Sequence, residues 1–228
     1  MQKILLIICC LLFSSCRHWA VSTVAFSDFE RVENQPVFVS PTMTPYEREK
    51  LLYTISQAKQ RVAGLFGAYT ATPVVIASYD RDIRTYLKNT YGSTYYFPHS
   101  SYVVVGANGL NMDVLAHELT HAELTHRLGY WRRVTQVPLW FDEGVAMQVD
   151  NRLDTSRDFR SAPPEKKSFR DFETNPSRDR YVLVKQELHR WLQPQPANRL
   201  NVFIQNMNKG MGFESAYAVR REFKTPSR

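Results

Sequence analysis

Apolar side chains recur every three or four positions between residues 45 and 67, and this spacing predicts an amphipathic helix. Pro45 suits the first helical turn, and Gly67 suits the position just beyond the last turn. The apolar positions are Leu51, Leu52, Ile55, Ala58, Val62 and Leu65. A helix with one such stripe must bury it, so this segment is predicted to cover a core.

Short β-branched runs follow this helix and predict strands. The run PVVIAS occupies residues 73–78, TYYF occupies 94–97, and SYVVVG occupies 101–106, with a break at 98–100. Between the first two runs, Asp80 is expected to cap a short helix that carries Ile83 and Leu87 and reaches Asn89.

Helical spacing returns after the last strand and continues to the end of the chain. Asn111 or Asp113 can cap a helix that Gly129 ends, and another helix is expected to start near Asp142. A polar stretch with three prolines at 161–180 predicts a long surface loop. Helices are then expected over 181–192, 197–207 and 213–223. The predicted class is α+β, with a mixed α/β front part and a helical back part.

The N-terminus has the features of an export signal. Lys3 precedes an uninterrupted apolar run at 4–13, which Ser14 and Ser15 follow. The next residue is Cys16, and LFSSC resembles the lipobox of bacterial lipoproteins, although Phe13 stands where that motif usually has Leu. The resemblance implies that residues 1–15 are a signal peptide and that Cys16 is lipidated. Ordinary secretory cleavage and a buried N-terminal helix are the alternatives.

The predicted domain organisation follows from this signal. Residues 16–44 lack a clear period and are interpreted as a tether with a short extended segment around 37–39, and residues 45–228 as one domain. The three cysteines are Cys9, Cys10 and Cys16, so the mature chain can form no internal disulfide. We therefore expect an exported protein on the periplasmic face of a bacterial membrane, or alternatively a secreted one.

The charge identifies no partner. The formal net charge is +7, but the basic residues are spread along the chain without a nucleic-acid-binding motif. Together with the export signal, this spread argues against nucleic acid as the partner. The oligomeric state is left open.

The strongest motif is HELTH at residues 117–121. Because His117 and His121 are one helical turn apart, both imidazoles project from one face and can share a tetrahedral ion, for which zinc is well suited. Glu118 leans over the same edge and suits a general base that acts on zinc-bound water. The competing interpretation is a chance occurrence of two histidines.

A third ligand must come from elsewhere in the chain. The metzincin pattern would need Gly at 124 and His at 127, where this chain has Leu124 and Arg127. His126 lies about 140° around the helix from His121, so it cannot bind the same ion. The repeated ELTH, with Glu123, is interpreted as a solvated face or as support behind the ligands. Glu143 in PLWFDEGVA, on a separate helix, is the better candidate.

HExxH followed by glutamate in a WxxEGxA setting resembles the gluzincins, the zinc peptidases that use two histidines and a glutamate. The resemblance implies a zincin-like fold and Zn²⁺ held by His117, His121 and Glu143. Thermolysin-type members place an acid where this chain has Met147, and the aminopeptidase string GxMEN is replaced by VVVGANGLN, so exopeptidase activity is not supported. Asp142 is expected to cap its helix, with a hydrogen bond to a ligand as the alternative.

The resemblance also points to an oxyanion donor and a substrate-binding strand. A tyrosine or histidine from the C-terminal helices is expected to stabilise the oxyanion, with Tyr181 first and His189 second. A core or surface tyrosine is the alternative for Tyr181. The strand 101–106 occupies the position of the edge strand that pairs with extended substrate in gluzincins, but a buried strand fits its sequence equally.

These features predict a zinc-dependent endopeptidase of the bacterial envelope. It would take peptide or protein substrates, activate water through Glu118 and attach to the membrane through Cys16. The alternative function is that of a catalytically inactive, metallopeptidase-like lipoprotein that binds an envelope partner.

Overall fold

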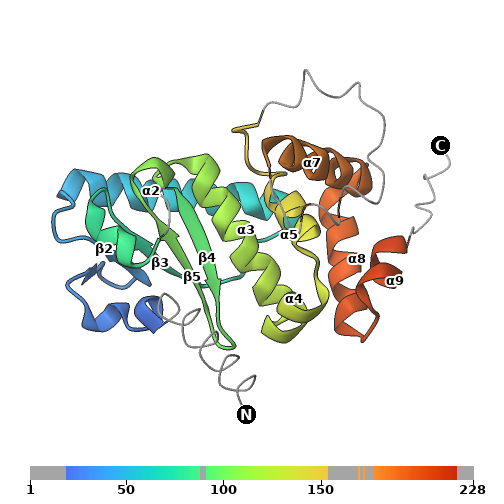
Figure 1. Cartoon of the computed structure of the whole chain (residues 1–228), viewed down its shortest axis with the longest axis horizontal. Helices are drawn as coiled ribbons and strands as arrows, with labels where there is room; N and C mark the ends of the chain where they lie inside the picture. Colours follow the sequence, from blue (N-terminus) through green and yellow to red (C-terminus); the bar gives the residue numbers. More distant parts are fainter. Residues whose placement is uncertain (1–18, 88–90, 154–168, 170–171, 173–176, 220–228) are drawn as a thin grey trace, which may run out of the picture.

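The computed structural model describes residues 19–87, 91–153, 169, 172 and 177–219 (Figure 1). The expected signal peptide, Cys16, most of the expected loop at 161–180 and the end of the last expected helix lie outside these residues. Within them the protein is a mixed α/β structure with a five-stranded sheet and a helical part beside it.

Three central strands of the sheet run parallel, and two outer strands run antiparallel to their neighbours. The order is β1 (Glu30–Arg31), β2 (Val37–Val39), β3 (Val74–Ala77), β5 (Ser101–Val105) and β4 (Gly92–Tyr96). The strand SYVVVG is therefore interior, and the expectation of an edge strand there is wrong. Its hairpin partner β4 takes the edge because β5 pairs on its other side with β3.

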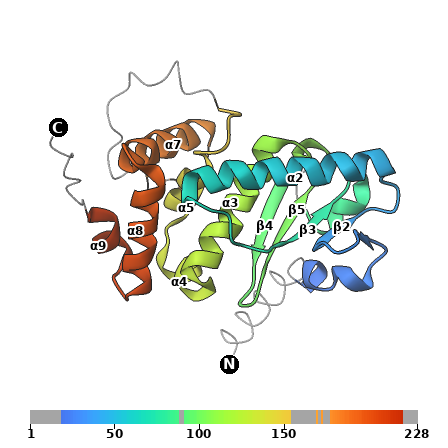
Figure 2. The same cartoon turned by 180° about the vertical axis from the view of Figure 1, so that it is seen from behind.

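The two faces of the sheet are buried by different parts of the chain. Val75 and Val103, which are register partners, point towards the main core with α2 (Pro45–Phe66) and α3 (Met112–Leu128). Figure 2 shows α2 lying across this face. Ile76 and Val104 point to the opposite face, where a second apolar cluster lies. This alternation follows from the two-residue period of a strand.

The two long helices predicted from the sequence are confirmed, together with their end signals. Thr44 and Glu47 form a reciprocal capping box before α2, and Gly67 ends the helix with a φ of 84°, in the left-handed region that glycine adopts easily. Asn111 caps α3 by accepting from the backbone N–H groups of Asp113 and Val114.

The segment after Asp80 differs from the expected helix. It is a five-residue 3₁₀ helix, η2 (Arg81–Thr85), and the Asp80 side chain forms no cap hydrogen bond. Its carboxylate instead accepts from the hydroxyl of Thr42. The carboxylate therefore connects this turn to the loop before α2.

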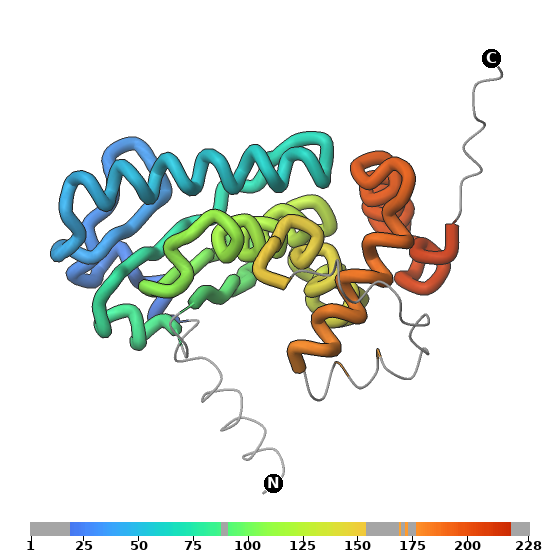
Figure 3. The backbone as a smooth tube through the Cα atoms, turned by 90° about the horizontal axis from the view of Figure 1, so that it is seen from above, coloured from blue at the N-terminus to red at the C-terminus, as the bar shows by residue number. Residues whose placement is uncertain are grey.

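The helical part packs at one end of the sheet (Figure 3). It contains α4 (Tyr130–Gln136), α5 (Leu139–Ala146), α7 (Arg178–Leu192), α8 (Pro196–Asn208) and α9 (Phe213–Ala218). The sequence did not predict α4, and α5 begins three residues before the expected Asp142. A cluster of aromatic rings holds this part together, with Phe141 at its centre.

The segment expected as a tether contributes to the fold from Val21 onward. Val21 and Val24 are buried in the second apolar cluster, and residues 30–39 supply β1 and β2. The extended segment expected at 37–39 is confirmed as β2. Among the described residues, no helix is both long and apolar enough to cross a bilayer.

Candidate metal centre

The two histidines of HELTH lie together on the buried side of α3. His117 is 7% exposed and His121 is 4% exposed, and their Nε2 atoms are 3.2 Å apart. The one-turn spacing produces this proximity, since residues four apart share a helix face. Two ring nitrogens therefore face the same small volume.

Glu143 of α5 brings a carboxylate to the same volume. Its Oε2 lies 3.3 Å from Nε2 of His117, and its Oε1 lies 3.8 Å from Nε2 of His121. One donor atom from each of the three residues lies within 4.8 Å of the other two. This buried group could hold a metal ion, as the sequence predicted for these three residues.

Packing between α5 and the other helices fixes the position of Glu143. Phe141, two residues earlier, is fully buried against Trp191 and Phe203. Gly144, one residue later, allows α7 to approach closely, because a Cβ at this position would lie 2.7 Å from a methyl carbon of Leu188. The small residue after Glu143 is therefore required by the contact between α5 and α7.

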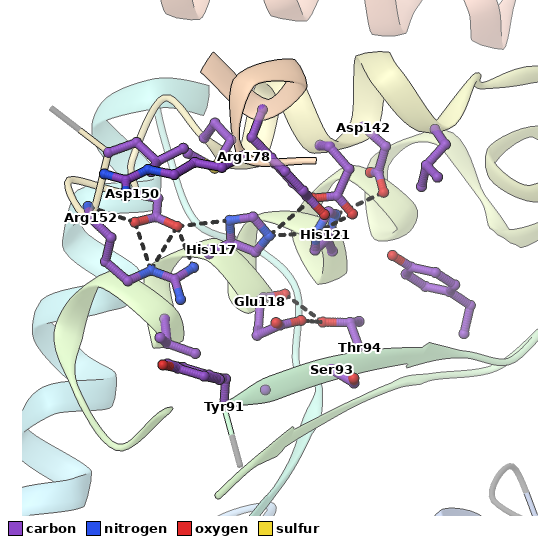
Figure 4. Close-up of a pocket in the computed structure, with 18 of the residues that line it drawn as sticks. Tyr91, Ser93, Thr94, His117, Glu118, His121, Asp142, Asp150, Arg152 and Arg178 are labelled. Carbon is purple, nitrogen blue, oxygen red and sulfur yellow. Dashed lines mark hydrogen bonds and ion pairs between the residues drawn. The ribbon is translucent and has the colours of Figure 1, made fainter. Parts of the chain in front are cut away.

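Each histidine contacts a buried aspartate through its other ring nitrogen (Figure 4). Nδ1 of His121 lies 2.8 Å from Oδ2 of Asp142, and Nδ1 of His117 lies 3.2 Å from Oδ2 of Asp150. A carboxylate at Nδ1 favours a proton there and leaves the Nε2 lone pair for an ion. Both histidines are therefore oriented as ligands.

An arginine in turn pairs with each aspartate. Arg133 of α4 donates to both oxygens of Asp142, and Arg152 donates to both oxygens of Asp150. The expectation that Asp142 caps a helix is wrong: Asp142 lies inside α5, and its carboxylate contacts His121 and Arg133. Asp142 is instead in contact with His121, one of the candidate metal ligands, as the alternative interpretation held.

Glu118 lies beside the three donor residues without being one of them. Its Oε2 accepts from the hydroxyl of Thr94 on β4 at 2.7 Å, and the same hydroxyl is 3.0 Å from the Glu118 carbonyl oxygen. Gly92 makes room for this carboxylate, because an added Cβ would lie 3.0 Å from it. The edge strand therefore sets the position of the expected general base (Figure 4).

A cavity of about 740 Å³ opens over these groups, between α3, β4, α5 and α7. Tyr181 of α7, the first expected oxyanion donor, lines the cavity. Burial, and to a smaller extent the nearby charges of Glu143 and Glu118, raise its pKa. Tyr181 is therefore a neutral hydrogen-bond donor at neutral pH. His189, the second expected donor, is exposed and does not line the cavity.

Comparison with protein-family models, curated proteins and solved structures finds no match.

Residues that the sequence did not identify complete the site. They are Thr94, Tyr96, Arg133, Asp150 and Arg152. Tyr96 is a partly buried residue of β4, and its phenol oxygen accepts from Arg133 at 3.2 Å. Of these five residues, Asp150 is the one that the sequence could have indicated, because it is an acidic residue seven positions after Glu143.

In the second ELTH, at residues 123–126, Glu123 is buried and His126 is exposed. Glu123 is fully buried, so its interpretation as a solvated residue is wrong. Its carboxylate accepts from the backbone N–H groups of Thr70 and Ala71 and from Arg127. Glu123 therefore connects α3 to the loop after α2 and does not line the cavity. His126 is exposed, as expected.

The charges around the donor group raise the pKa of both histidines. Burial lowers the pKa of His117, but Asp150 and Glu143 outweigh that effect and raise it to about 10. Asp142 and Glu143 likewise overcome burial and raise the pKa of His121. Burial opposes ionisation of Glu143, yet the two imidazoles hold its pKa below the usual value.

We predict that metal binding displaces a proton from this group and strengthens as the pH rises. An ion needs an unprotonated Nε2 atom, whereas the pKa of His117, raised to about 10 by Asp150 and Glu143, favours a second ring proton at neutral pH. The affinity for zinc should then rise about tenfold per pH unit for each proton displaced. Calorimetric titration with zinc, in buffers of different ionisation enthalpy, measures the proton release. A pH-independent affinity without proton release would contradict the prediction.

Proposed function

We propose that this protein is a zinc-dependent endopeptidase of the bacterial envelope, with the zincin-like fold and ligand set of the gluzincins. One observation carries the proposal: His117, His121 and Glu143 converge on one point, with Glu118 beside them but outside the donor group. A site that only bound an ion would have no need of a carboxylate in that position.

The donor spacing supports zinc. Bonds of about 2.0–2.1 Å in a tetrahedral arrangement place donor atoms roughly 3.3 Å apart. The His117 and His121 nitrogens are 3.2 Å apart, and oxygens of Glu143 lie 3.3 Å from the His117 nitrogen and 3.8 Å from the His121 nitrogen. Two imidazoles and one carboxylate are also a donor set that zinc enzymes use, with one position left open. The carboxylates behind both histidines strengthen them as ligands.

The proton transfers of peptide hydrolysis fit the position of Glu118. Bound zinc would act as a Lewis acid that makes water more acidic and polarises the substrate carbonyl. The Glu118 carboxylate takes one proton from water as the water oxygen attacks the peptide carbon. It then delivers that proton to the leaving nitrogen as the C–N bond breaks. Thr94 holds the carboxylate between these two steps through the hydrogen bond at 2.7 Å.

Two further elements position the substrate in this mechanism. The phenol of Tyr181 donates a hydrogen bond to the carbonyl oxygen as negative charge develops there. The edge strand β4, which supplies Gly92, Ser93, Thr94 and Tyr96 to the cavity wall, pairs with an extended substrate segment. A peptide bound along β4 would pass over Glu118, so cleavage within a chain is favoured.

The zinc-loaded protein should cleave a mixture of quenched peptides, and a chelator should stop the cleavage. Added zinc should restore it. An inert loaded protein that still binds zinc would favour the alternative function, in which the domain binds an envelope partner without catalysis.

Export and lipidation belong to the same proposal. We predict that Cys16 is lipidated in a bacterial host, because it directly follows an apolar run and two small residues. Labelling with a clickable palmitate analogue should mark the wild-type protein and not Cys16→Ser. Equal labelling of both proteins would refute lipidation at this residue.

A further inference from the structure

The first described residues are fixed to the sheet rather than extended away from it. Val21 is fully buried and Val24 is 2% exposed, and both pack with Ile76 and Val104 on the face opposite α2. The Ser27 hydroxyl donates to the Val24 carbonyl at 2.6 Å and closes the 3₁₀ turn η1 (Val24–Phe26). The orientation of this segment relative to the domain is therefore set by packing.

Two large apolar side chains of this packed segment face solvent. Trp19 is 71% exposed and Phe26 is 91% exposed. We call these two residues the N-terminal aromatic surface. Burial of the neighbouring valines cannot explain them, because neither residue belongs to the buried cluster. Trp and Phe are favoured in the headgroup region of a bilayer, where a rigid ring can be partly dehydrated.

The distance to Cys16 identifies a membrane as the occupant of this surface. Trp19 is three positions after Cys16 in the sequence, and three positions span at most about 11 Å. An acyl chain attached at Cys16 would enter the bilayer, so Trp19 could not lie far from the headgroups. Phe26 is seven positions after Trp19 in the same short helical segment, so both rings would then lie near the headgroups.

We propose that the N-terminal aromatic surface inserts among lipid headgroups and holds the domain in one orientation on the membrane. The inference rests on the lipid attachment proposed at Cys16, but not on peptidase activity. Figures 1 and 2 show the N-terminal segment at the lower edge of the molecule and α7, one wall of the cavity, at the upper edge. The helix α3, which carries the histidines, packs on the other face of the sheet. The sheet then separates the candidate metal centre from the bilayer, and the substrate arrives from the aqueous side.

Fluorescence quenching on vesicles tests this orientation with the full-length lipidated protein. The protein is purified from bacterial membranes and placed in vesicles of phosphatidylethanolamine and phosphatidylglycerol that contain brominated phosphatidylcholine. The chain has four tryptophans, so Trp19 is measured as the difference between wild type and Trp19→Tyr. Phe26→Trp adds a second reporter. Tyr53→Trp is the matched control, since Tyr53 is 66% exposed on α2, across the sheet.

We expect most of the quenching to disappear in Trp19→Tyr, and Phe26→Trp to gain quenched emission that Tyr53→Trp does not gain. Equal quenching of wild type and Trp19→Tyr, with no difference between the two added reporters, would overturn the proposal. Failure of the protein to float with the vesicles would also overturn it. None of these readouts depends on zinc or hydrolysis, so the peptidase proposal stands or falls separately.

Discussion

Glu118→Gln should keep the fold and the zinc ion while losing peptide hydrolysis by about 10²- to 10⁴-fold, the usual contribution of a general acid–base group. Glutamine has nearly the same shape as glutamate, and its amide oxygen can still accept from Thr94, which bonds the carboxylate at 2.7 Å. It cannot take a proton from water. The variant therefore removes the proton transfer and leaves the packing against β4 in place.

The measurement compares zinc content, melting temperature and peptide cleavage. Glu49→Gln on the exposed face of α2 is the matched control and should behave as wild type. Equal cleavage by wild type and Glu118→Gln would show that Glu118 is not the base. Lost zinc or a lowered melting temperature would assign Glu118 a structural or ligand role instead.

His121→Ala should lose the zinc ion. Substitution of residues behind a metal ligand already weakens binding about 10- to 100-fold, so removal of a ligand should weaken it by more than about 100-fold. Asp142 would remain paired with Arg133, so the substitution leaves no isolated buried charge. We therefore expect a folded protein with little bound zinc.

His126→Ala provides an internal control for this experiment. His126 lies on the same helix, five residues further along, and is exposed. Elemental analysis should find one zinc per chain in His126→Ala and in the wild type. Full occupancy in His121→Ala, or equal loss in both variants, would refute the ligand assignment.

Local patterns were enough to predict the elements that present the site. The spacing of Leu51, Ile55 and Val62 fixes α2, and the one-turn spacing of His117 and His121 on a capped helix places both imidazoles on one face. Helix formation and the face on which a side chain projects depend on residues a few positions apart, and the geometry of a helix is the same in any fold.

Features that depend on tertiary contacts could not be predicted. Glu123 looks like a surface residue in the repeated ELTH, yet its buried carboxylate accepts from backbone groups of Thr70 and Ala71, more than fifty positions earlier. The role of Asp142 depends on its contact with Arg133, which lies on α4, a helix that the sequence pattern does not predict. Strand order was similarly hidden, since the sequence of β5 fits an edge and an interior position equally well.

X-ray absorption at the zinc edge of the loaded wild-type protein tests the central claim most directly. We expect one zinc per chain with two imidazole nitrogens at about 2.0–2.1 Å and carboxylate oxygen at about 2.0–2.2 Å. Multiple scattering from two imidazole rings should be present, and one ring should vanish from the residual signal of His121→Ala. A first shell that contains sulfur, or that lacks imidazole, would contradict a zinc centre built from His117, His121 and Glu143.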